Sequence, residues 1–207
     1  MRDDLKIVWD VPPTPPGLVG RVERFMGPGT SPAEWAVGGA GLVVCGFLLV
    51  AGTAGSADWR GWSGLQCTVV VLVGLDLVGG VLTNATHAAK RWYHRPGPGR
   101  RRARLLFVTA HLGHLLAVGL IVLSGDWRWT LTHAGLLLAG AVVVEFTPLH
   151  LKRPVAMGVL MAAVLVDLFW LDAPAALGWF APLFFLKLLV CHLVPEAPLE
   201  RGRRPDA

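Results

Sequence analysis

The fold is decided by the stretch from Asp76 to His114, which reads DLVGGVLTNATHAAKRWYHRPGPGRRRARLLFVTAHLGH. Its two ends are apolar runs that carry a few ionisable side chains, and its middle is basic. An ionisable group is costly to bury in a membrane, so such groups are expected to face other helices or a wet cavity. The stretch therefore predicts two antiparallel membrane helices joined by a basic loop.

Apolar residues are gathered into six blocks along the chain. They make up 54% of the 207 residues, and charged residues make up only 16%, whereas about a quarter of the residues of a soluble domain are charged. Each block has roughly 20 residues, the length with which an α-helix crosses a hydrocarbon core of about 30 Å. The blocks are 35–54, 64–86, 105–125, 129–147, 154–171 and 176–194. The sequence predicts an all-α, polytopic integral membrane protein with six transmembrane helices.

The apolar blocks divide the chain into three parts. Residues 1–33 form a polar, proline-rich N-terminal arm, residues 34–195 the transmembrane domain and residues 196–207 a basic tail. Within the arm, residues 17–26 interleave apolar side chains with arginines, which leaves two interpretations, a short helix on the membrane surface or a flexible arm. Three cysteines, Cys45, Cys67 and Cys191, lie in apolar blocks. There they predict packing, and neither disulfides nor a cysteine-based metal site.

The basic residues alternate from one loop to the next. All but three of the 19 Lys and Arg lie in the arm, in the segment 90–104, after the fourth block or in the tail. The exceptions are Arg60, Arg128 and Lys187. Because positively charged loops stay in the cytoplasm, we expect both termini to be cytoplasmic in a multi-pass protein of the bacterial plasma (inner) membrane. An even number of spans agrees with this orientation.

A polar stripe runs along the second predicted helix. Its members are Asp76, Gly80, Thr83, Asn84 and His87. At 3.6 residues per turn these positions fall on one face of a helix. The glycine within the stripe would let another helix approach closely, so the face is predicted to lie inside the bundle.

The third predicted helix carries His111 and His114 on one face, three residues apart. At 1.5 Å per residue, counted from the basic end at Arg104, they lie roughly 10 and 15 Å into the membrane. Asp76 is then about 16 Å deep in the antiparallel second helix. Other ionisable residues predicted for the same half of the bundle are Glu145, Lys187 and His192. On the outer side His133 and Asp167 have similar depths, which we interpret first as a packing hydrogen bond.

Three chemistries fit the inner group. In the first, imidazole and carboxylate ligands hold a divalent metal such as Zn or Fe. Its histidine ligands would be His87, His111, His114 and His192. In the second, Asp76, His111 and His114 form a catalytic acid–base group without metal. In the third, the same groups relay protons or bind a transported ion, with Asp76 and Lys187 as the coupling pair.

The basic loop between the second and third helices predicts a partner. Nucleic acid is one interpretation, but the anionic leaflet of the membrane is nearer, and each basic residue beside it is worth about 1 kcal/mol. We therefore expect membrane lipids as partners, with an anionic head group held at the loop. The predicted substrate-binding residues are Asn84, Lys90, Arg91, His94, Arg95 and Lys187.

The leading functional hypothesis is a membrane-embedded enzyme that acts on a lipid or isoprenoid-like substrate through Asp76, His111 and His114. The alternative is a small proton- or ion-coupled transporter that uses Asp76 and Lys187. Two further hypotheses are a haem protein that uses imidazoles on two helices, such as His111 and His192, and a structural membrane subunit. Whether the protein is an enzyme, and in which oligomeric state it works, is not predicted.

Overall fold

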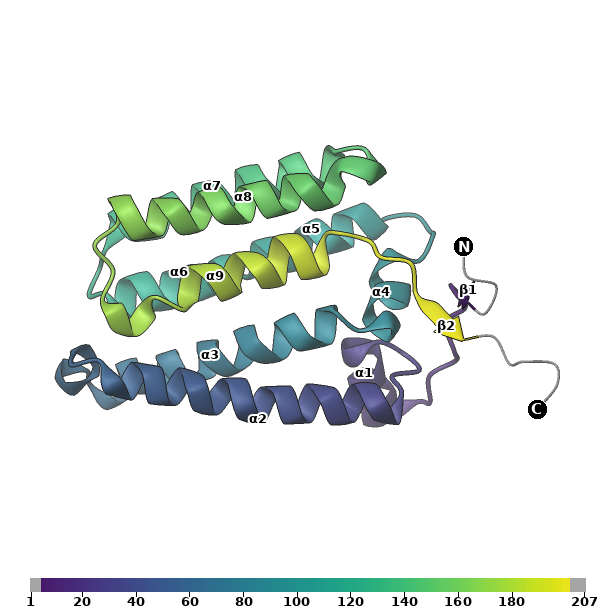
Figure 1. Ribbon diagram of the computed structural model, residues 1–207, viewed down its shortest axis with the longest axis horizontal. Coiled ribbons are helices and arrows are strands. Elements are labelled where there is room, and N and C mark those ends of the chain that lie inside the picture. The colour runs from purple at the N-terminus through teal and green to yellow at the C-terminus, as the bar shows by residue number, and fades with distance from the viewer. Residues whose placement is uncertain (1–4, 202–207) are drawn as a thin grey trace.

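Six long helices lie side by side and antiparallel in this computed structural model, which describes residues 5–201 (Figure 1). All six are long and apolar enough to cross a membrane, as predicted from the sequence. Four are continuous: α2 (Pro32–Gly55), α3 (Gly64–Asn84), α7 (Trp127–Phe146) and α8 (Leu149–Trp170). The other two are composite: α5 (Arg100–Ala110), α6 (Leu112–Leu116) and the π-helix η2 (Ala117–Val122), then the 3₁₀-helix η3 (Ala175–Leu177), α9 (Phe180–Phe185) and the π-helix η4 (Leu186–His192).

The short elements gather mostly at one end of the bundle, which we call the basic end and define by Lys90, Arg91, Arg101, Arg104 and Lys152. Two short helices lie there, α1 (Gly17–Met26) and α4 (His87–His94). Beside them β1 (Leu5–Ile7) pairs antiparallel with β2 (Leu199–Arg201), so the first and last described segments meet at the same end (Figure 1). The opposite end carries the 3₁₀-helix η1 (Asp58–Gly61).

The segment after Asn84 differs from the predicted basic loop, because half of it is helical. Thr86 begins α4 by accepting a hydrogen bond from the Ala89 backbone N–H at 3.1 Å, an ordinary N-cap. Its first turns are buried, and Ala88 is fully covered. The helix α4 therefore packs against α1, α3 and α5 and is not a solvent-exposed loop.

Local sequence signals explain where the long helices start. Ser31 and Glu34 form a reciprocal capping box at the start of α2, and Ser63 and Gln66 form another at the start of α3. Each box satisfies two backbone N–H groups that a helix leaves open. Asp126 caps α7 by accepting a hydrogen bond from the Trp129 backbone N–H at 2.9 Å.

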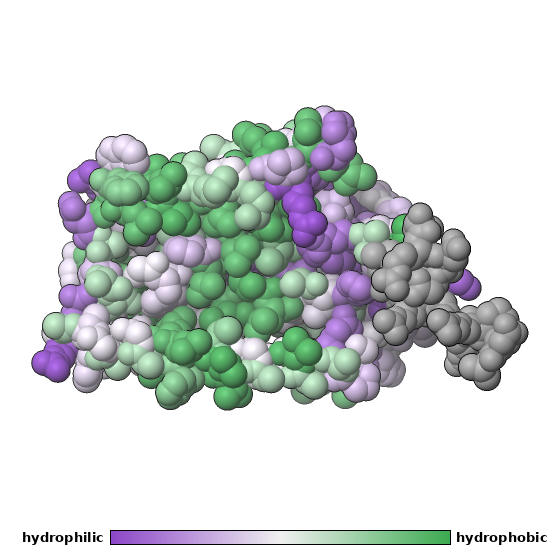
Figure 2. Space-filling model, viewed as in Figure 1, coloured by the Kyte–Doolittle hydropathy of each residue, from purple (hydrophilic) through white to green (hydrophobic). Residues whose placement is uncertain are grey.

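The outer surface of the bundle is apolar over its middle. Figure 2 shows green, hydrophobic residues across the centre and purple, hydrophilic residues toward both ends. The helix α2 contributes strongly, since none of its residues is buried and Val43, Phe47 and Leu48 are largely exposed. An exposed apolar surface of this kind suits contact with lipid chains.

The core is formed by α3, the third span, α7, α8 and the sixth span. Its fully buried members include Leu77, Val118, Phe184, Phe185 and Leu188. Both π-helices, η2 and η4, pack against α3. π-Helical turns are rare and are found frequently at functional sites, so η2 and η4 point to a functional site beside α3.

A buried ion cluster ties three helices together at the basic end. The Glu145 side chain on α7 is 1% exposed and accepts hydrogen bonds from both Nε and Nη2 of Arg104 on α5, at 3.3 Å for Nε. Lys152 on α8 donates from Nζ to the Glu145 carbonyl at 2.8 Å and lies 3.8 Å from its carboxylate. Arg101 on α5 also lies 3.6 Å from the Glu145 carboxylate, so Glu145 serves as the anion for cations from two neighbouring helices.

Candidate functional site

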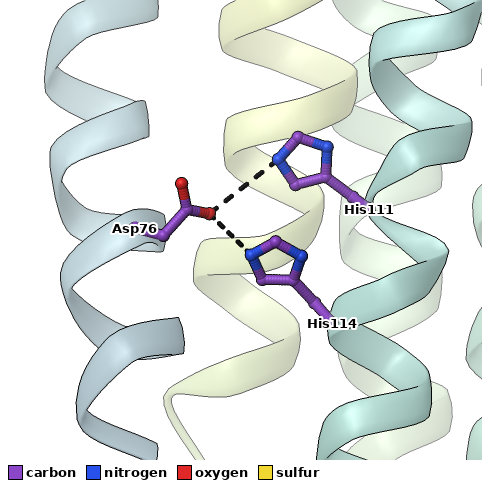
Figure 3. A group of neighbouring side chains, drawn as sticks. All are labelled: Asp76, His111 and His114. Carbon is purple, nitrogen blue, oxygen red and sulfur yellow. Dashed lines mark hydrogen bonds and ion pairs between the residues drawn. The ribbon is translucent and has the colours of Figure 1, made fainter. Parts of the chain in front are cut away.

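Asp76, His111 and His114 meet between α3 and the third span, where the Asp76 side chain is 39% exposed and the His111 side chain 9% exposed. Asp76 extends from α3 toward two imidazoles on the facing helix, one at the junction of α5 with α6 and one on α6 (Figure 3). The Oδ2 atom of Asp76 lies 2.8 Å from Nε2 of His114 and 3.8 Å from Nε2 of His111. The two rings stack with centroids 4.8 Å apart. The predicted catalytic trio is therefore one cluster.

The backbone fixes how His111 presents its ring. Its Nδ1 lies 2.7 Å from the carbonyl oxygen of Phe107, one helical turn earlier, so Nδ1 carries the proton and donates it. In the neutral imidazole Nε2 then carries a lone pair, which faces Asp76. A histidine oriented by a carbonyl at Nδ1 is the usual form of a metal ligand. The lone pair on Nε2 of His111 is thus directed toward Asp76, where a metal ion could accept it.

The three side chains have the spacing of a metal site. One ligand atom from each of Asp76, His111 and His114 can be chosen so that all lie within 4.8 Å of one another. Two imidazole nitrogens and a carboxylate oxygen suit Zn and Fe. These three side chains are therefore a group that could hold a metal ion.

Lys187 completes the cluster from the sixth span. It lies in the π-helix η4 with 2% of its side chain exposed, and its Nζ donates to Oδ2 of Asp76 at 2.5 Å and to the Asp76 carbonyl at 3.3 Å. Nζ of Lys187 and Nε2 of His114 therefore contact the same carboxylate oxygen of Asp76. Lys187 is therefore paired with Asp76, as the coupling-pair hypothesis expects.

A cavity of about 440 Å³ opens beside this cluster. The charged corner is formed by Asp76, His111, His114 and Lys187, and most of the remaining wall is apolar. The apolar wall includes Met26 of α1, Leu42 of α2, Leu75 and Phe107. The cavity thus joins one ionic corner to an apolar chamber between the helices.

Gly80 makes room for the lysine, which leads to a first prediction. A Cβ at this position would lie 2.2 Å from Cε and 2.8 Å from Nζ of Lys187. We expect Gly80→Ala to fold, because the end of a lysine side chain is flexible, but to push the ammonium away from Asp76. Protection of Lys187 against an amine-reactive reagent, followed by mass spectrometry, measures this directly. Gly79→Ala, where only Leu42 comes within 4 Å, is the matched control and should leave the protection unchanged.

His192, a predicted metal ligand, lies outside the cluster. It is 1% exposed, and its ring stacks on Phe107 with centroids 4.1 Å apart. Phe107 in turn contacts His111 at 4.7 Å between centroids. Within the described part of the chain neither nitrogen of the His192 ring has a hydrogen-bond partner. The phenyl ring occupies the space between His111 and His192, where a haem bound by both would have to sit.

Lys90 and His94, two of the predicted substrate-binding residues, point at the end of the last helix. Lys90 donates from Nζ to the carbonyls of Cys191 and Val194 at 2.6 and 2.7 Å, and Nε2 of His94 donates to the His192 carbonyl at 2.9 Å. Burial lowers the pKa of Lys90, and burial with the nearby Lys90 and Arg104 charges lowers the pKa of His94 to about 3. The hydrogen bonds from Lys90 and His94 satisfy backbone carbonyls that the end of the last helix leaves without partners.

Three of the remaining predicted residues line two cavities, and Arg95 lines neither. Asn84 is buried and lines the cavity of the Asp76 cluster. His87 and Arg91 line a second cavity of about 680 Å³ between the starts of α2 and α4 and the end of α3. Arg95 stacks its guanidinium over the Trp92 ring at 3.3 Å. The structure thus brings together four of the predicted residues, Asp76, His111, His114 and Lys187, with Asn84 on the same cavity wall.

Two contributors to the site were not anticipated from the sequence. The Phe107 carbonyl orients His111, and α1 supplies Phe25 and Met26 to the cavity wall. The first follows from the spacing of four residues within a helix and could have been inferred from it. The contribution of α1 could not be inferred, because the apolar pattern of residues 17–26 predicts a helix but does not specify the surface that this helix covers.

The fold and the cluster define a class of protein. The chain is an all-α protein with six helices that could span a membrane and with an aspartate–histidine cluster between them. Comparison with protein-family models, with curated proteins and with solved structures gave no match to this chain.

Proposed function

We propose that the protein is a membrane-embedded, metal-dependent enzyme that acts on a lipid or isoprenoid-like substrate. The observation that carries this proposal is the convergence of Asp76, His111 and His114, whose chosen ligand atoms lie within 4.8 Å of one another beside a cavity. An ion with three protein ligands keeps positions open for water, and a bound metal lowers the pKa of that water toward neutrality. The cluster would thereby supply a nucleophile in the membrane interior.

The shape of the cavity supports an amphiphilic substrate. Its apolar wall, which includes Leu42, Leu75 and Phe107, suits a hydrocarbon chain, while the ionic corner suits a polar or anionic group. Most of a ligand pocket is ordinarily apolar, and a few polar groups set the orientation of the ligand. In this proposal the basic end faces the cytoplasm, as the positive charges there favour, and anionic head groups gather around it.

Lys187 and a metal ion would compete for the same oxygen of Asp76, which gives a second prediction. Two unit charges 4 Å apart interact by about 4 kcal/mol at an effective dielectric constant near 20. Loss of even a third of that repulsion is worth about tenfold in affinity. We therefore expect Lys187→Met to bind Zn²⁺ at least about tenfold more tightly than the wild type in isothermal titration calorimetry. Unchanged or weaker binding would contradict the competition.

Activity is tested on purified, detergent-solubilised protein that has been stripped with a chelator and reloaded with Zn²⁺, Fe²⁺ or Mn²⁺. Extracted membrane lipids are the substrate mixture, and mass spectrometry follows the lipids consumed and the products formed. Turnover that needs the metal and is lost in Asp76→Asn supports the proposal. Metal binding without turnover of any lipid would reject the enzymatic part and keep the metal site.

A second function is favoured by the direct contact of Lys187 with Asp76 at 2.5 Å. An ion pair between a buried lysine and an aspartate whose side chain is 39% exposed at a cavity suits proton- or ion-coupled transport, in which the partners separate and recombine. Protein reconstituted in vesicles with an internal pH indicator distinguishes the two functions. Proton flux that persists without metal and disappears in Lys187→Met would replace the enzyme with the transporter.

A further inference from the structure

The short helix α1 lies at the basic end, against α4, with its apolar side exposed (Figure 1). Leu18, Val22 and Phe25 are 75%, 46% and 63% exposed. At 3.6 residues per turn their directions differ by about 60° at most, so they form one stripe. Gly20, on the opposite side, is buried. The apolar stripe of a helix on a soluble domain faces the core, so α1 is turned the other way.

The polar side of α1 packs on the arm that precedes it. Arg24 donates from Nη1 to Oγ1 of Thr14 at 2.6 Å. A Cβ at Gly20 would overlap the carbonyl group of Pro15, so no side chain fits between the helix and the arm there. Glu23 shares this side and is half-buried. The polar side is thus covered, while the described part of the chain leaves the apolar side uncovered.

The end of α1 is fixed to two helices of the bundle. The Tyr93 hydroxyl on α4 donates to the Phe25 carbonyl at 3.0 Å, and the Thr83 hydroxyl on α3 donates to the sulfur of Met26 at 3.9 Å. The chain then passes so close to α4 that a Cβ at Gly27 would overlap the α4 backbone. These contacts give the apolar stripe one direction.

That direction is toward the membrane-spanning part of the bundle. Phe25 lines the cavity with the ionic corner, together with Leu42 of α2 and Leu75 of α3. Counted at 1.5 Å per residue from the helix ends at the basic end, both leucines are roughly 14 Å deep. Phe25 therefore stands at the mouth of a cavity that extends into the spans, and Leu18 and Val22 share its side of the helix.

We propose that α1 is a membrane-surface helix that places Leu18, Val22 and Phe25 among the lipid chains of the leaflet at the basic end. Helices of this kind bury their apolar side about 5–10 Å into the boundary between head groups and chains. Arg21 is exposed beside the stripe, and a basic side chain there attracts anionic head groups. The stripe is too small for a stable contact between proteins, which takes about 20–30 residues a side.

The placement of α1 concerns where the chain meets the membrane and does not depend on the chemistry of the Asp76 cluster. Its consequence for the substrate rests on the proposed function. Phe25 and Met26 belong to the cavity wall, so the rim of the cavity lies within the leaflet. A lipid substrate then reaches the cluster without passing through water.

The test uses the full chain in vesicles of phosphatidylcholine with a minor share of phosphatidylglycerol. A photoactivatable phospholipid carries a diazirine near the head-group end of one chain, and mass spectrometry locates the labelled residues. We expect label on Leu18, Val22 and Phe25 about as strong as on Val37, which is exposed near the start of α2. A labelled Val37 with no label on residues 17–26 would overturn the inference.

A charged variant identifies the stripe as the surface in contact. Leu18→Asp/Val22→Asp should lower the label on residues 17–26 at least about tenfold and leave the label on Val37 unchanged. The reason is that the burial of two aliphatic side chains exceeds what a tenfold change requires. Leu18→Ile/Val22→Ile is the matched control and should keep the label. Full labelling of the charged variant would show that the stripe is not what contacts lipid.

Two measurements on unsubstituted protein decide the matter if the charged variant does not fold. A diazirine at the far end of the lipid chain should label Val43 strongly, since it lies roughly 16 Å deep in α2, and residues 17–26 weakly. Equal labelling would exclude a surface position. Photoreactive leucine incorporated throughout the chain reports the neighbour of Leu18. Lipid is expected there, and a second copy of the chain would assign the stripe to a dimer and overturn the inference.

Discussion

The His111→Ala/His114→Ala variant is expected to lose metal binding by more than about 100-fold. Replacement of residues that merely orient a ligand costs 10- to 100-fold in metal affinity, and this variant removes two of the three ligands themselves. Both rings border the cavity, and His111 also packs against Phe107. Elemental analysis after dialysis against a fixed concentration of free Zn²⁺ gives the stoichiometry, and calorimetry gives the affinity.

Two single variants serve as controls for this experiment. His150→Ala removes an imidazole from the exposed start of α8, and His87→Ala removes a sequence-predicted ligand that lies in the other cavity. Both should bind as the wild type does. If His87→Ala weakens binding as much as the double variant, the metal is held elsewhere than in the Asp76 cluster.

The Glu145→Ala variant is expected to unfold more readily by about 3–5 kcal/mol, the usual result when one partner of a buried ion pair is removed. The Glu145 carboxylate is almost inaccessible and lies beside Arg101, Arg104 and Lys152, so its loss leaves three cations without their anion. The effect should appear as a lower midpoint in denaturant or in thermal unfolding of the detergent-solubilised protein.

A surface pair provides the contrast. Arg153 and Glu196 are 2.7 Å apart with side-chain exposures of 72% and 39%, and an exposed pair of this kind contributes about 1 kcal/mol or less. Glu196→Ala should therefore shift the midpoint little. If Glu145→Ala and Glu196→Ala had equal effects, the buried cluster would not hold α5, α7 and α8 together.

The coarse architecture was predictable because its physical signal is strong. Six apolar blocks of membrane-spanning length give six helices, and the rise per residue places Asp76 level with His114 on antiparallel neighbours, where the two are in contact. The same depth argument brought His133 level with Asp167, and these also meet. Depth along a helix can be counted from the sequence, so contacts that need only equal depth were found.

The direction in which a side chain points from its helix axis could not be derived from the sequence in the same way. The sixth span ends in the π-helix η4, where each turn holds more residues than in an α-helix. Projection at 3.6 residues per turn therefore fails to give the directions of Lys187 and His192, and only Lys187 reaches the Asp76 cluster. Lys90 was assigned to a loop because its neighbours are charged, whereas the carbonyls that attract it belong to residues one hundred positions later.

The pairing of β1 with β2 brings the first and last described segments of the chain side by side. Ile7 is the partner of Leu199, and paired strands lie roughly 5 Å apart, so a short peptide link could join the two segments without disturbing any span. The sequence could then be reopened at the turn of residues 56–63 between α2 and α3, where η1 is fully outside the core. Such a circular permutant would begin with α3 and end with α2, and the order of the helices in space would be preserved although their order in the gene had changed.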